Sequence, residues 1–351
     1  MLQTNLLAHG HADLVTHITY DFYGERLATC SADQRIKLFR KSVESVWELE
    51  AEWKAHDAPI LRISFAHPIH GSLIASCGHD RTVRIWEEPS TSSSSAPGNK
   101  DGRWIERAVL GGAKGSVRAV EFSPPNPAFG LRLAALSTDS HLRIYTSLDP
   151  SLNDWTTAHD ISVPALPSPI SNEEGPNGAT GNVNADNGDT ANGGWGLSWC
   201  REKWWGSILA VFTGTNPTVK IIKLDPTPTA ILHLTPSSTA APLTTLAWAP
   251  SCGRSYHLLA TGSRDGTVRI WRMEPPEKEA KRGEWTAEVV GEFGRGGARV
   301  AMVDWNATGT TLTTSDDEGI VRVYKPTYAK TWKLLGKMTA EEPPADEPNG
   351  H

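Results

Sequence analysis

Two histidine pairs have the spacing in this sequence that comes closest to a metal site. They are His9-Gly-His11 and His67-Pro-Ile-His70. A zinc site needs three or four His, Cys or carboxylate ligands, and neither pair has cysteine or carboxylate partners at metal spacing. We therefore expect neither pair to bind a metal.

The cysteines and the common catalytic motifs also give no sign of an enzyme. The four cysteines lie far apart and form no Cys-x-x-Cys pair, which argues against a zinc site or a disulfide framework; they are Cys30, Cys77, Cys200 and Cys252. No Gly-x-Ser-x-Gly, phosphate-binding loop or His-Glu-x-x-His motif is present. We predict a protein without catalytic residues, cofactor or small-molecule ligand.

An acidic residue followed six positions later by an aromatic residue recurs along the chain. The matching pairs are Asp33 and Phe39, Asp80 and Trp86, Asp139 and Tyr145, Asp265 and Trp271, and Glu318 and Tyr324, with a degenerate copy from Asn216 to Ile222. The residues between each pair alternate as in a strand, and the acid falls in the preceding turn, where a carboxylate can accept backbone N–H bonds. A structural role in a hairpin explains this repetition better than catalysis does.

Two further markers define the repeat. Each copy is preceded by a strand with an aromatic residue: Tyr20, Phe65, Phe122, Trp199, Trp248 and Trp305. A tryptophan opens the following strand in every copy but the fourth: Trp47, Trp104, Trp155, Trp285 and Trp332. Four short strands per repeat predict an all-β, six-bladed β-propeller within residues 1–339. The expected blades are 10–54, 55–111, 112–163, 195–236, 241–294 and 297–339.

Composition sets limits on the loops and on the ligands. The segments 89–103, 164–194 and 340–351 are rich in Gly, Ser, Asn or Pro, or in Glu and Pro, and we expect them to be disordered. The formal net charge of −6 offers no basic stripe for nucleic acid. No run of 18 apolar residues occurs, so we expect no direct membrane insertion.

Six repeats of this form resemble the WD40 family, although the Trp-Asp pair that gives the family its name is absent. Glu87 follows Trp86 and Arg272 follows Trp271, and the histidine of the family's hydrogen-bond relay can be matched only to His11 and His56. "DLVTHITYDFYGERLATCSADQRIKLF" and "APSCGRSYHLLATGSRDGTVRIW" are similar to the SEH-type nucleoporins of the nuclear pore Y-complex. The related propeller of the COPII outer coat is the alternative, and a closed WD40 module that reads peptides is a second one.

Each predicted blade keeps its own fourth strand, so no strand is left to close the seam between blades one and six. The propeller is therefore expected to be open and unlatched. The resemblance implies that a helical-solenoid nucleoporin of the Y-complex inserts a seventh blade there. It also implies a scaffold role in mRNA and protein transport at the nuclear envelope, and in a vacuolar or lysosomal complex that regulates TORC1. We expect the partner to contact Asp13, Leu14, Val15, Val300, Met302 and Val303.

Overall fold

The computed structural model describes most of the chain. The described residues are 7, 10–43, 46–88, 104–126, 129–147, 149, 151–167, 192–202, 206–236, 241–276, 284–294, 296–328 and 331–339. The segments 89–103 and 340–351, predicted to be disordered, lie outside them. Of the predicted loop 164–194, residues 164–167 and 192–194 are described. The Nζ of Lys220 in blade four donates to the carbonyl oxygens of Val163, Pro164 and Leu166. The first four residues of this predicted loop are thus anchored to blade four.

The described strands form six antiparallel sheets of four strands each, which confirms the six predicted blades. Blades one to four comprise β1 (Val15–Tyr20), β2 (Arg26–Ser31), β3 (Arg35–Lys41), β4 (Trp47–Lys54); β5 (Ile60–Phe65), β6 (Leu73–Gly78), β7 (Val83–Glu87), β8 (Ile105–Leu110); β9 (Val117–Phe122), β10 (Leu131–Ser137), β11 (His141–Ser147), β12 (Thr156–Ser162); and β13 (Gly194–Trp199), β14 (Ile208–Gly214), β15 (Val219–Lys223), β16 (Thr229–Leu234). Blades five and six comprise β17 (Leu243–Trp248), β18 (His257–Ser263), β19 (Val268–Glu274), β20 (Thr286–Phe293); and β21 (Val300–Trp305), β22 (Leu312–Asp316), β23 (Ile320–Pro326), β24 (Trp332–Thr339).

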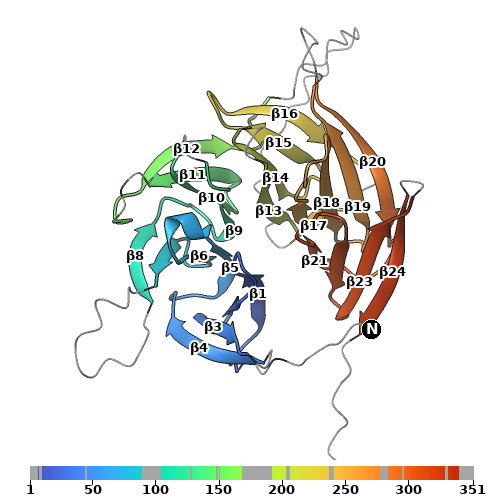
Figure 1. Ribbon diagram of the computed structural model, residues 1–351. Helices are drawn as coiled ribbons and strands as arrows, with labels where there is room; N and C mark the ends of the chain where they lie inside the picture. The colour runs from blue at the N-terminus through green and yellow to red at the C-terminus, as the bar shows by residue number, and fades with distance from the viewer. Residues whose placement is uncertain are drawn as a thin grey trace, which may run out of the picture. The chain divides into compact units, whose positions relative to one another are not determined.

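Every described blade is built from four consecutive strands (Figure 1). Among the described residues, therefore, no strand from one end of the chain completes a blade at the other, as the prediction of an unlatched propeller requires. The only helical segment in these ranges is a 3₁₀ turn at Pro68–His70. The described residues include no helix with the length and hydropathy needed to cross a membrane.

The chain divides into two compact units, residues 1–233 with blades one to four and residues 234–351 with blades five and six. Within each unit, the core lies between neighbouring blades. In the first unit, Ile36 and Leu38 of β3 share a buried cluster with Ile63 of the next blade. In the second unit, Val268 and Ile270 of β19 share one with Val303. Ile36 and Leu38 of a third strand therefore face the next blade, and Ile63 of a first strand faces the preceding one.

Polar contacts fix this packing at matching positions. The hydroxyl of Thr16 in blade one donates to the carbonyl oxygen of Ile60 in blade two at 2.7 Å. Thr244 in blade five makes the same bond to Val300 in blade six at 2.6 Å. Each hydroxyl donates a hydrogen bond to a carbonyl oxygen of the adjacent blade. These hydrogen bonds, together with the apolar contacts, hold neighbouring blades in register.

Candidate partner-binding surface

One apolar position on the first strand of blade one is exposed. The same position is buried in the blades that follow another blade within their unit. Ile18 pairs with Thr29 across β1 and β2, and Ile63 pairs with Ser76 at the same register in blade two. Ile18 is 44% exposed, whereas Ile63 is 1% exposed. The residues equivalent to Ile63 in blades three, four and six are also buried: Val120, Leu197 and Val303. The face of blade one that would meet a preceding blade is therefore bare within its unit.

An aromatic residue at the end of β1 extends this bare face. Tyr20 is 57% exposed, although its counterparts Phe122, Trp199 and Trp305 are buried. The indoles of Trp199 and Trp305 donate from Nε1 to carbonyl oxygens of the preceding blades, those of Glu121 and Ala247. The ring of Tyr20 lies 5.8 Å from that of Trp47 in β4, so the two rings share the exposed face. Leu49 of β4, which is 53% exposed, pairs with Phe39 in the same sheet.

Next to Ile18 the surface is hollowed. The hollow has a volume of about 740 Å³, counting the part open to solvent. It is lined by Leu7, Asp13, Leu14, Val15, Ile18 and Thr29. The structure thus brings together Asp13, Leu14 and Val15, the three seam residues predicted in blade one. Leu14 is 71% exposed, so its side chain is available to a partner.

Two of the three seam residues predicted in blade six, Val300 and Val303, need correction. Val300 and Val303 are each 3% exposed and lie in the core that joins blades five and six. They are buried because their side chains point toward blade five. Met302 is half-buried on the same strand. Met302 has the register of Ala119 in blade three, which packs toward the following blade, so Met302 stays a predicted residue of the outward face.

The outward face of blade six also includes residues of its third strand. Val321 and Val323 of β23 are half-buried. At the equivalent positions of blade five, Val268 and Ile270 are 3% and 0% exposed. We define the bare face of blade one as Leu14, Val15, Ile18, Tyr20 and Leu49. Sequence reasoning missed Ile18, Tyr20 and Leu49, although aligning the six first strands gives the signal that identifies the first two.

The turn acids of blades one and two belong to hydrogen-bond relays. In blade two, His56 Nδ1 lies 2.7 Å from the Asp80 carboxylate and Nε2 lies 2.7 Å from Ser76 Oγ. Trp86 Nε1 donates to the same hydroxyl at 2.9 Å. With Nδ1–H donated to the carboxylate, a neutral ring accepts the Ser76 proton at Nε2, which satisfies the chain of groups. The relay ties the turn to the third strand and has a structural role.

A similar relay in blade one joins His11 to Asp33 at 2.8 Å and to Thr29 Oγ1 at 2.9 Å. Here Phe39 occupies the position of the tryptophan, so the relay ends at the threonine hydroxyl. In blade five, Trp271 Nε1 donates to Thr261 at 3.1 Å, and Asp265 accepts from the backbone N–H of Thr267 at 3.0 Å. The turn roles predicted for these acids therefore match their contacts.

Arginine replaces histidine in two other blades. In blade three, Arg143 Nη2 donates to Asp139 at 3.0 Å. In blade six, Arg322 Nη1 donates to Asp316 at 2.5 Å, and the Asp316 carboxylate also accepts from the backbone N–H groups of Glu318 and Ile320. The sequence alignment assigned this turn role to Glu318, but its side chain is exposed and Asp316 supplies the carboxylate.

These hydrogen-bonded turn acids, most of them half-buried, predict loss of stability in acid. Burial opposes ionisation of Asp139, but hydrogen bonds from Arg143 and Ser137 lower its pKa from 3.8 to about 2. Because the folded-state pKa is depressed, the stabilisation is present above about pH 4 and is lost as the pH falls toward 2. Asp139 is partly open to solvent, and screening keeps its share of the loss below the value that the pKa shift alone would give. Urea unfolding between about pH 5 and pH 2 measures it.

The variant Asp139→Asn should unfold more easily at neutral pH and show a shallower dependence of stability on pH, because one titrating group is gone. Asp317→Asn, in the exposed β22–β23 turn, is the charge-matched control. An unchanged pH slope in Asp139→Asn would contradict the assignment.

His11 and His67, one member of each histidine pair, make hydrogen bonds within the fold. His11 belongs to the relay of blade one, and His67 Nδ1 accepts from the backbone N–H of Ile69. Burial raises the pKa of Cys30 and of Cys200 to about 12, so neither thiol is a nucleophile near neutral pH. In the described part of the chain, no three His, Cys, Asp or Glu residues are grouped closely enough to hold a metal ion. His9 lies outside the described residues.

Comparison with known proteins agrees with this geometry. The family described as "WD domain, G-beta repeat" matches residues 2–40, 47–87 and 230–272. The chain is 33% identical to nucleoporin seh1 of Schizosaccharomyces pombe, over 98% of this chain and 97% of that protein. It is 31% identical to nucleoporin SEH1 of Saccharomyces cerevisiae, over 95% and 98%, and 32% identical to that of Homo sapiens, over 99% and 91%.

Proposed function

This chain belongs to the nucleoporin SEH1 family, and from that premise we propose that it is a non-enzymatic scaffold subunit of the nuclear pore Y-complex. A helical-solenoid nucleoporin of that complex contributes a β-blade that packs on the bare face of blade one. The seam between blades one and six is therefore the partner-binding site.

The observation that carries this proposal is the exposure of Ile18. Its equivalents in blades two, three, four and six are buried, so blade one has the packing surface of an inner blade without a preceding blade in its own unit. Fully burying one aliphatic side chain is worth about 1.5–3 kcal/mol. Covering Leu14, Val15, Ile18, Tyr20 and Leu49 would thus supply a substantial part of a stable association.

The half-buried Val321 and Val323 support a second contact on the outward face of blade six. An inserted blade would present its own third strand to Ile18, as β3 does to Ile63. It would also receive the third strand of blade six against its first strand. Each surface has apolar residues against which a further blade could pack.

The proposal extends to support of mRNA and protein transport through the pore, and to peripheral membership of a vacuolar or lysosomal complex that regulates TORC1. A seam that accepts one blade binds one solenoid at a time. A subunit shared between two complexes would therefore be divided between them by the supply of each solenoid.

Affinity purification of the tagged full-length chain from its own cells, followed by cross-linking and mass spectrometry, tests the proposal. We expect a stoichiometric solenoid nucleoporin with cross-links to blades one and six, and recovery of other Y-complex subunits. The same tag on an unrelated propeller is the control. Recovery of a COPII coat solenoid in place of the nucleoporin would overturn the assignment to the pore.

A further inference from the structure

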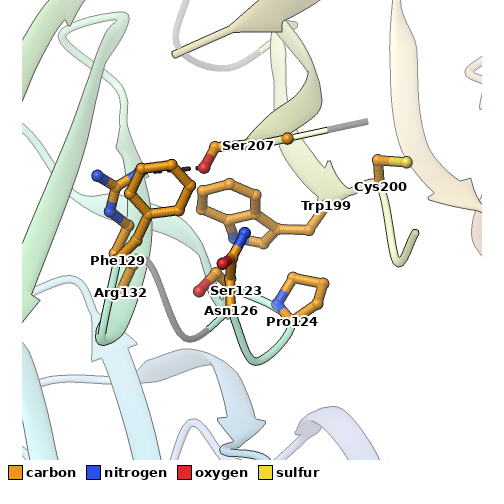
Figure 2. A pocket seen from close by; sticks show the side chains of 9 residues that line it. Ser123, Pro124, Asn126, Phe129, Arg132, Trp199, Cys200 and Ser207 are labelled. Atoms are coloured by element: carbon orange, nitrogen blue, oxygen red, sulfur yellow. Dashed lines mark hydrogen bonds between the residues drawn. The ribbon is translucent and has the colours of Figure 1, made fainter. Parts of the chain in front are cut away.

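Two arginines of blade three reach blade four, and they differ in their partners. Arg132 on β10 donates from Nη1 to Ser207 at 3.1 Å, as Figure 2 shows, and to the Asp225 carboxylate at 3.0 Å. Arg118 on β9 contacts the ring of Trp195 on β13, with its guanidinium carbon 5.9 Å from the ring centre. Among the described residues, Arg118 has no hydrogen-bond acceptor and no carboxylate at ion-pair distance.

The lack of an acid partner is unusual for an arginine at this depth in the first unit. Other buried or half-buried arginines of this unit lie within ion-pair distance of a carboxylate; they are Arg26, Arg84, Arg107, Arg132 and Arg143. Arg118 is half-buried as well. Its Nε–H group is buried without an acceptor, whereas its two Nη groups are open to solvent. The Nη groups are therefore the donors that a ligand can reach.

No group that contacts Arg118 in the described part of the chain balances its charge. Burial lowers the pKa of Arg118 below its ordinary value, and the thiol of Cys77 is the acid that offsets this effect. Cys77 is 0% exposed, and burial raises the pKa of its thiol far above the ordinary value, so the thiol is neutral near pH 7. The indole of Trp195 offers no acceptor, because its Nε1–H is itself a buried donor without a partner.

The position of Arg118 in its strand is used differently in two other blades. Between Val117 and Ala119, β9 has one extra residue relative to β10, and that residue is Arg118. In β1 and β17 the extra residue is Thr16 or Thr244, whose hydroxyl donates to a carbonyl oxygen of the following blade. A bulge of this kind often directs a side chain toward a functional site. Blade three thus has a cation where two other blades have a bond between blades.

The surroundings of Arg118 on blade two are polar and neutral. Nδ1 of His79, in the β6–β7 turn, lies 2.9 Å from Ser116 Oγ. His79 is exposed, and partial burial together with the charge of Arg118 lowers the pKa of its imidazole. The ring is therefore neutral near pH 7. The positive charge at this place on the surface is that of the guanidinium.

A single carboxylate matches this arrangement best. The acids of the neighbouring turns, Asp80 and Asp139, are already held by hydrogen bonds within their own blades. One positive charge is balanced by one carboxylate, whereas a phosphate dianion would keep an excess negative charge beside the neutral His79. The planar fork of a guanidinium also fits the two oxygens of a carboxylate. The formal net charge of −6 opposes the approach of a polyanion such as nucleic acid.

We propose that Arg118 binds the side-chain carboxylate of an aspartate or glutamate in an acidic segment of a partner protein. The open Nη groups donate to the two carboxylate oxygens, and the ring of Trp195 supports the guanidinium from blade four. This site is separate from the bare face of blade one.

Fluorescence polarisation with the purified full-length chain at low ionic strength tests this inference. The probe is a fluorescein-labelled peptide, Gly-Glu-Gly-Glu-Gly-Glu-Gly, and the control peptide has glutamine in place of every glutamate. We expect saturable binding of the probe with a dissociation constant below about 1 mM and no saturation with the control peptide. Absence of saturable binding, or equal binding of the two peptides, overturns the proposal.

Two variants of Arg118 locate the binding. Arg118→Gln removes the charge and should weaken binding at least about tenfold. Arg118→Lys keeps the charge but lacks the planar fork, and should weaken binding about threefold. Arg201→Gln is the matched control, because Arg201 is exposed and follows β13 at the end opposite to Trp195. Equal weakening by Arg118→Gln and Arg201→Gln would mean that general charge attraction holds the peptide, which overturns the assignment.

Folding of each variant is checked by near-ultraviolet circular dichroism. Arg118→Gln removes a half-buried charge that lacks an acid partner among the described residues, so we expect it to fold. If it does not fold, Arg118→Lys decides the question, and an affinity equal to that of the unaltered chain contradicts the proposal.

The pKa of His79, followed by nuclear magnetic resonance of its imidazole, gives a readout that is independent of affinity. A bound carboxylate should raise this pKa, because it offsets the charge of Arg118. Arg118→Gln should raise the pKa as well, and the peptide should then have no further effect. A pKa of His79 that does not change at peptide saturation would place the peptide elsewhere and overturn the proposal. At least tenfold tighter binding of a phosphoserine peptide would overturn the choice of a carboxylate.

Discussion

Ile63→Ala should destabilise the folded chain by about 2–5 kcal/mol, whereas Ile18→Ala should cost less than about 1 kcal/mol. The two isoleucines occupy the same register position in neighbouring blades. Ile63 is 1% exposed, so truncation leaves a cavity against Ile36 and Leu38 of blade one. Ile18 is 44% exposed, so truncation removes contacts mainly with solvent.

Urea unfolding of the purified chain, followed by tryptophan fluorescence, measures both changes at neutral pH. Thermal unfolding provides an independent comparison. Equal losses in the two variants would mean that blade one is packed like blade two, and would contradict the description of its face as bare. Addition of the partner should make Ile18→Ala the more damaging change at the seam, because the side chain is then buried.

Local patterns were sufficient to predict the blades, because a hairpin depends on residues close in sequence. The third strand from Val268, with its alternation and its preceding Asp265-Gly266 turn, needs no distant contact to be identified. His11 and His56 could also be matched to relays from their position before a blade. The structure then showed which hydroxyl each imidazole contacts.

Which neighbouring blade each face of a strand contacts could not be predicted in the same way. Alternation separates the two faces of β21, but it does not say which face meets blade five, so Val300 and Val303 were assigned to the seam. Arg132 and Asp225 are 93 residues apart, and no local pattern relates them.

In blade six, Asp316, Asp317 and Glu318 are consecutive in the sequence. A fixed offset from Tyr324 selected Glu318, whereas the contact with Arg322 selects Asp316. Burial decides which acid of such a run is structural, and the sequence does not report burial at single-residue resolution.

Ile18→Asp should reduce capture of the solenoid partner by at least about 100-fold. An inserted blade would have to bury a carboxylate with no matching cation, and an unpaired buried charge costs several kcal/mol. A loss of about 2.7 kcal/mol already corresponds to 100-fold. In the isolated chain the carboxylate stays in water on the bare face, so the fold should tolerate it.

Val109→Asp is the matched control for this prediction. Val109 lies on β8, the fourth strand of blade two, and is 49% exposed, close to the 44% of Ile18. It therefore receives the same charge on a similarly exposed strand, but away from the seam. Co-expression with the solenoid and quantitative pull-down should give full capture by Val109→Asp and almost none by Ile18→Asp. If both variants captured the solenoid equally, the partner would not be packed on blade one, and the bare face would need another explanation.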